Sequence, residues 1–84
     1  MKDCLITFRS ITPVQRAEGI LQQAGIHCSL QRTPKWMEEK GCGYSLKVSV
    51  GQLQQAVKLL YAQNVPFRKI YCIRQNGTAE EMTL

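Results

Sequence analysis

A cysteine between two glycines is the residue of this sequence best suited to covalent chemistry. Cys42 stands between Gly41 and Gly43, just before a strand-like run. Glycines have no side chains that could pack around a structural cysteine, and they leave room for a partner's sulfur atom to approach along the S–S axis. The pattern therefore indicates a thiol that could exchange sulfur with another molecule.

Charged residues near this thiol have opposing effects on its ionisation. Lys35, Lys40 and Arg32 favour the thiolate, which is the reactive form, while Glu38 and Glu39 oppose it. The flanking glycines also permit a backbone nest whose N–H groups point toward an anion. The residues alone leave two interpretations open, a reactive thiol or a turn in which the cysteine is incidental.

The other three cysteines, Cys4, Cys28 and Cys72, lie in strand-like runs in which alternation places each on the same face as apolar residues two positions away. This alternation predicts three buried, inert thiols. No two cysteines form a C-x-x-C pair, and His27 lies directly beside Cys28, which is not a ligand spacing. We therefore expect neither a metal site nor another cofactor.

Composition favours one small cytoplasmic domain. The chain has 84 residues, 44% of them hydrophobic, and a net charge of +5. It runs from Met-Lys-Asp straight into a strand-like segment, which predicts no secretory leader, and no apolar stretch approaches the roughly 20 residues that span a bilayer. In the cytoplasm the thiols are expected to be reduced.

Hydrophobic periodicity predicts the order β-α-β-β-α-β. The predicted strands cover residues 3–9, 26–31, 44–50 and 66–74, and the helices cover 10–25 and 51–64. Thr12 is the expected N-cap of the first helix, and Ser49 with Gln52 forms an expected capping box for the second. Gly25 and Asn64 are expected to end the two helices in the left-handed conformation.

This order predicts an α+β, ferredoxin-like fold, a split βαβ with a four-stranded antiparallel sheet and both helices on one face. Residues 1–76 form the predicted domain, and residues 77–84 form a predicted disordered tail. Strand parity leaves the other face of the sheet open, with these residues on it: Leu5, Thr7, Arg9, Ser45, Lys47, Ser49, Lys69, Tyr71 and Ile73.

The run "KGCGYSLK" also resembles the RNP1 motif of RNA-recognition domains, which share the predicted element order. In that motif the third and fifth residues stack bases on the open face of the sheet. Here the third residue is Cys42, and Tyr44 is in phase with the core-facing Leu46 and Val48. A shift of one residue turns every side chain to the opposite face, so nucleic-acid binding is not expected beyond nonspecific charge.

Several segments together resemble the Se/S carrier protein-like family, small bacterial domains that handle sulfur or selenium on a single cysteine. The segments are "LITFRS", "AEGILQQAGI", "TPK", "GCGYSLKV" and "AVKLLYAQNVPFRKIYCI". They cover residues 4–74, and their most specific element is the Thr-Pro of the long loop followed by Cys-Gly. The resemblance implies that Cys42 carries the sulfur or selenium as a persulfide or selenopersulfide.

We therefore expect a sulfur or selenium carrier, an accessory protein more than a stand-alone enzyme. Its expected partners are a cysteine desulfurase-like donor and an acceptor protein, without a membrane. The expected site comprises Cys42 with these activating residues: Gly41, Gly43, Lys35, Lys40 and Arg32. The alternative is a non-catalytic binding or regulatory module that docks a protein or ligand on its open sheet face. Homodimerisation is compatible with both.

Overall fold

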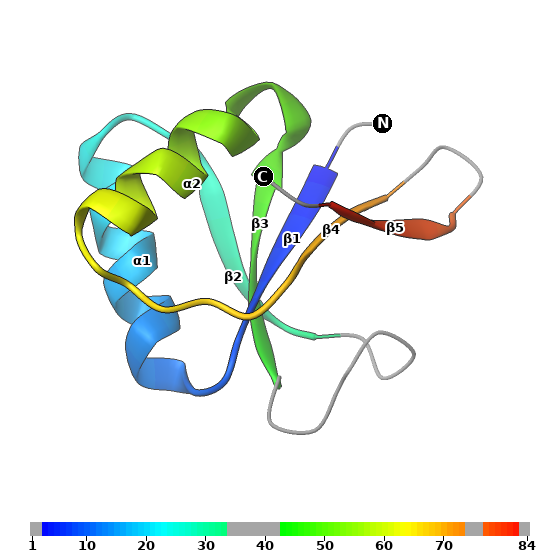
Figure 1. Cartoon of the computed structure of the whole chain (residues 1–84), viewed down its shortest axis with the longest axis horizontal. Coiled ribbons are helices and arrows are strands. Elements are labelled where there is room, and N and C mark those ends of the chain that lie inside the picture. The colour runs from blue at the N-terminus through cyan, green and yellow to red at the C-terminus, as the bar shows by residue number, and fades with distance from the viewer. Residues whose placement is uncertain (1–2, 34–42, 74–76, 83–84) are drawn as a thin grey trace.

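Two helices pack side by side on one face of an antiparallel sheet in the computed structural model, which describes residues 3–33, 43–73 and 77–82 (Figure 1). The elements in chain order are β1 (Asp3–Phe8), α1 (Ile11–Gln23), β2 (Cys28–Arg32), β3 (Tyr44–Ser49), a short 3₁₀ turn (Val50–Gln52), α2 (Leu53–Ala62), β4 (Ile70–Ile73) and β5 (Ala79–Met82). The predicted α+β class is confirmed.

The sheet has five strands in the order β2-β3-β1-β4-β5, so the predicted number of four is wrong. The additional strand is Ala79–Met82, which we had assigned to a disordered tail, and it pairs antiparallel with β4. Its Met82 lies opposite Ile70 and packs against the core, while Glu81 forms an ion pair with Lys69 at 3.6 Å. A strand of four residues with two acids carries too little alternation to be predicted.

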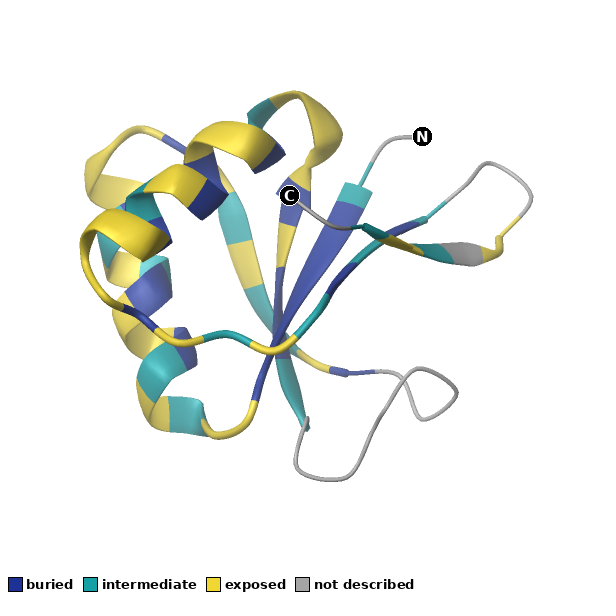
Figure 2. Ribbon diagram, in the orientation of Figure 1, coloured by how far each residue is buried: buried dark blue, intermediate teal, exposed yellow. Residues whose placement is uncertain are grey.

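Apolar stripes on the two helices cover the sheet and form the core (Figure 2). Four apolar residues of α2 are buried: Leu53, Ala56, Val57 and Leu60. On α1, Val14, Ala17 and Leu21 are buried, while Ala24, the C-cap residue, is exposed. The core is therefore a layer between two helices and one side of the sheet.

Both helices begin differently from the prediction. α1 starts two residues before Pro13, after the N-cap Ser10 instead of Thr12. Proline is tolerated there because the first N–H groups of a helix have no acceptor within the helix. Ser49 precedes the 3₁₀ turn and Gln52 precedes α2, and neither makes a side-chain capping bond, so the predicted capping box is wrong.

The predicted helix ends are confirmed. Gly25 and Asn64 follow the two helices with φ angles of 80° and 57°, in the left-handed region. Beyond them, Ile26 and Val65 are buried, and the N–H of each donates at 2.9 Å to the carbonyl oxygen five residues earlier. This hydrogen bond and apolar contact are typical of a Schellman ending.

Strand β1 is buried on both faces. Besides the core residues on the helix side, Leu5 and Thr7 are only 0% and 1% exposed, and Ser45 of β3, opposite Thr7, is 0% exposed. The sequence predicts these three residues on an open face, and for them this prediction is wrong. Alternation along a strand separates its two faces, but it does not reveal which face is covered.

A disulfide between Cys4 and Cys72 joins β1 to β4 inside the core, where both residues are 0% exposed. Burial was predicted correctly for both, but the prediction of inert free thiols is wrong. The two residues lie directly opposite each other in the strand register. Parity places both cysteines on one face, but the sequence does not fix the register that brings their sulfur atoms together.

We predict that reducing this disulfide lowers the free energy of unfolding by about 2–4 kcal/mol, because it removes a cross-link over a sequence separation of 68 residues. Urea unfolding with and without reductant measures the loss. Cys28→Ala is the control and should keep the full dependence on reductant. Equal stability in both conditions, or alkylation of all four cysteines without reductant, would contradict the prediction.

Candidate functional site

The loop predicted to carry the reactive thiol leaves β2 after Arg32 and returns to β3 at Tyr44. These two residues pair across the strands, and the N–H of Thr33 donates to the carbonyl oxygen of Gly43 at 3.1 Å. This hydrogen bond continues the β2–β3 ladder and closes the base of the loop. Gly43 thus leads directly into β3, with Cys42 preceding it in the sequence.

Two of the predicted site residues, Arg32 and Gly43, belong to the described part of the chain. The others lie outside the described residues: Lys35, Lys40, Gly41 and Cys42. The guanidinium carbon of Arg32 lies 5.2 Å from the centroid of the Tyr44 ring, over its face. This cation–π contact holds an exposed positive charge at the base of the loop.

Two buried hydroxyl groups at the same place were missed by sequence reasoning. Among the described residues, the side-chain oxygens of Thr33 and Ser45 are buried without a hydrogen-bond partner, in residues that are 4% and 0% exposed. An unsatisfied buried hydroxyl costs on the order of 1–3 kcal/mol, which favours a functional explanation. Both groups could donate an O–H hydrogen bond to an anion.

The three described cysteines are poor nucleophiles. Cys4 and Cys72 are joined in the core, and Cys28 is the free cysteine among the residues described. The Cys28 thiol donates to the carbonyl oxygen of Glu18 at an S···O distance of 3.9 Å. Burial, and then the Glu18 carboxylate, raise the pKa of this thiol above its ordinary value.

Within residues 3–33, 43–73 and 77–82, no three His, Cys, Asp or Glu residues are grouped so as to hold a metal ion. No helix in these ranges is both long and apolar enough to cross a membrane.

Residues 3–72 match the family described as "Putative Se/S carrier protein-like". The chain belongs to this family. The match covers most of the 84 residues and includes the whole loop between Thr33 and Gly43. It confirms the resemblance found in the sequence. No curated protein and no solved structure matches the chain.

We predict that Ser45→Ala and Thr33→Val leave the stability of this family member unchanged or raise it by up to about 1 kcal/mol, because each removes a buried hydroxyl without a partner. Urea unfolding measures the change. Thr7→Val is the matched control, since the Thr7 hydroxyl donates to the Lys69 carbonyl oxygen at 3.2 Å and accepts the Lys69 N–H at 2.9 Å. The control should lose about 1–3 kcal/mol. A similar loss in Ser45→Ala would contradict the prediction.

We also predict that Cys28 reacts several-fold more slowly with iodoacetamide in the folded protein than in urea at pH 8, because its raised pKa lowers the thiolate fraction. Peptide mass mapping identifies the alkylated residue. The folded protein keeps this thiol protonated, whereas the thiol of the unfolded chain ionises above about pH 8.5. The free energy of unfolding of the wild type, relative to that of Cys28→Ala, should therefore fall as the pH rises above this value. A relative stability that rises over this pH range would oppose the assignment.

Proposed function

We propose that this protein carries sulfane sulfur or selenium as a persulfide or selenopersulfide on Cys42 and passes it to a partner. The observation that carries the proposal is the family match over residues 3–72, a span that includes Cys42. In this proposal the protein receives sulfur from one enzyme and delivers it to another protein, and it does not catalyse a reaction by itself.

The state of the other cysteines supports this choice of residue. A carrier thiol must ionise and must be reached by a donor's persulfide. Cys4 and Cys72 have no free thiol, and the Cys28 thiol has a raised pKa and a carbonyl partner. Cys42, which lies outside the described residues, is the remaining cysteine of the four in the sequence.

The transfer step needs no external oxidant. The Cys42 thiolate attacks the outer sulfur of a donor persulfide, R–S–SH. A new S–S bond forms at Cys42, the S–S bond of the donor breaks, and the donor leaves as the thiolate R–S⁻. The sulfane sulfur keeps its oxidation state. In delivery, an acceptor thiolate attacks the outer sulfur of the Cys42 persulfide, and Cys42 leaves as the thiolate.

The base of the loop offers groups suited to a thiolate and to an anionic persulfide. Arg32 holds its charge over Tyr44, and the unpartnered hydroxyls of Thr33 and Ser45 can donate hydrogen bonds. In the proposed site, Lys35 and Lys40 are cations that favour the thiolate. Gly41 and Gly43 leave room for a partner's sulfur atom to reach Cys42.

The proposed setting follows from the carrier role. The donor is a cysteine desulfurase-like protein, the acceptor is a second protein, and the location is the cytoplasm, where complete burial shields the Cys4–Cys72 disulfide from reductants. We also propose that the fold is ferredoxin-like with β5 added at one edge. The strand order β2-β3-β1-β4 and the two helices on one face support this assignment (Figure 1).

The test is mass spectrometry after incubation with a cysteine desulfurase and cysteine. The wild type should gain about 32 Da, one sulfur atom, and dithiothreitol should remove it. Cys42→Ser should gain nothing, while Cys28→Ser should gain the same adduct as the wild type. Thr33→Val and Ser45→Ala, which we expect to keep the fold, should shorten the lifetime of the adduct several-fold.

Absence of the adduct from the wild type would overturn the proposal, and so would its persistence in Cys42→Ser. Loss of the adduct in Cys28→Ser would also contradict the proposal, because it would indicate that Cys28 carries the sulfur.

A further inference from the structure

A cavity opens where α1 begins and where the segment after α2 approaches β4. None of the described cysteines (Cys4, Cys28 and Cys72) lines it. Its volume is about 510 Å³, within the range of roughly 300–1,000 Å³ that is usual for small-molecule sites. Three arginines, Arg9, Arg16 and Arg68, line it together with apolar residues. A cavity of this composition is suited to an anion that also has an apolar body.

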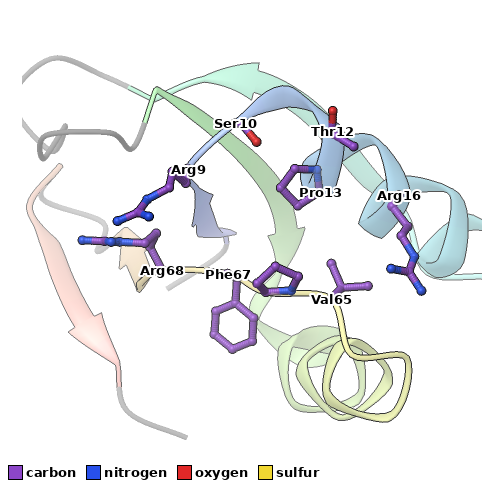
Figure 3. Close-up of a pocket in the computed structure, with 9 residues that line it drawn as sticks. Arg9, Ser10, Thr12, Pro13, Arg16, Val65, Phe67 and Arg68 are labelled. Carbon is purple, nitrogen blue, oxygen red and sulfur yellow. The ribbon is translucent and has the colours of Figure 1, made fainter.

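The arginines mark the two ends of this cavity. Figure 3 shows the side chains of Arg9 and Arg68 extending in the same direction at one end, with Arg16 at the other end. Arg16 already donates to the carbonyl oxygen of Gln63 at 3.1 Å. The first two arginines therefore form the stronger anion-binding end.

Backbone hydrogen bonds fix the position of this arginine pair. The N–H of Arg68 donates to the carbonyl oxygen of Thr7 at 2.7 Å, and the N–H of Thr7 donates to the carbonyl oxygen of Lys69 at 2.8 Å. These bonds hold Arg68 beside the end of β1, which Arg9 follows. The two like charges are thus kept near each other by the fold and not by a flexible loop.

No acidic side chain among the described residues forms an ion pair with Arg9, Arg16 or Arg68. Guanidinium groups present planar sets of N–H donors that match the oxygens of a phosphate or carboxylate. A pair of such groups balances a doubly charged phosphomonoester better than a single carboxylate. The N-terminal N–H groups of α1 add positive potential at the same cavity.

Between the arginines the cavity wall is apolar. Pro13 of α1, Val65 and Phe67 line this part of the cavity, and Figure 3 shows these side chains between the Arg9–Arg68 pair and Arg16. The Phe67 ring is fixed by an edge-on contact with Tyr61, at a centroid distance of 5.4 Å. One ring suits a single planar group, whereas a nucleic-acid strand needs several stacking platforms.

We propose that this cavity binds a small phosphomonoester with a planar apolar group, such as a nucleoside monophosphate, with the phosphate between Arg9 and Arg68 and the planar group against Phe67. This site is additional to the proposed thiol chemistry and does not depend on it.

Isothermal titration calorimetry at constant ionic strength tests the proposal with four probes. Adenosine monophosphate should bind at least about tenfold more tightly than inorganic phosphate, which lacks the apolar body, and than adenosine, which lacks the phosphate. A short single-stranded RNA, whose internal phosphates are singly charged diesters, should bind no more tightly than the monophosphate.

Variants of the exposed arginines locate the site. Arg9→Gln and Arg68→Gln should each weaken adenosine monophosphate binding about tenfold, and Arg16→Gln should weaken it less. Lys58→Gln is the matched control, because it removes one positive charge from an exposed position on α2 outside the cavity. It should bind like the wild type. Amide NMR spectra confirm that each variant is folded.

Four results would overturn the proposal. They are no binding of adenosine monophosphate, equal binding of adenosine or of inorganic phosphate, equal weakening by Lys58→Gln and Arg68→Gln, and RNA binding tenfold tighter than that of the monophosphate. Persulfide formation on Cys42 is measured separately by mass, so failure of one proposal leaves the other intact.

Discussion

The pairing of β1 on both of its edges is the constraint on which the rest of the molecule depends. β1 is hydrogen-bonded to β3 on one side and to β4 on the other, and Cys4 to Phe8 are all 0–1% exposed. A strand enclosed in this way has one possible register, because a slip of one residue would turn Ile6 and Phe8 out of the core. Both the disulfide and the base of the cysteine loop take their positions from this register.

The same register brings the two proposed sites to one end of the sheet. Phe8 pairs with Tyr44, so Arg9, which follows Phe8, and Gly43, which precedes Tyr44, lie at neighbouring strand ends. Arg32 pairs with Tyr44 from the other side. Positive charge is therefore gathered at one end of the sheet by strand geometry, although the arginines are far apart in the sequence.

The sequence allowed much of the fold to be predicted, while the choice of Cys42 as the reactive thiol stays a prediction. Periodicity was sufficient for both helices, for the first three strands and for the helix ends at Gly25 and Asn64, because these signals are local. β5 and the Cys4–Cys72 bond were missed, because both depend on which strands become neighbours. The hydroxyls of Thr33 and Ser45 were missed for a related reason, since alternation placed Ser45 where water would satisfy it.

The burial of the Cys4–Cys72 bond has a consequence for the proposed carrier role. A persulfide exchanges with any disulfide that it can touch, and an accessible disulfide in the same molecule would divert the cargo into a dead-end internal bridge. Both sulfur-bearing residues are 0% exposed beneath two helices, so collisions with this bond are prevented while the fold is intact. The core would thus keep this permanent S–S bond apart from the transferable S–S bond proposed on Cys42.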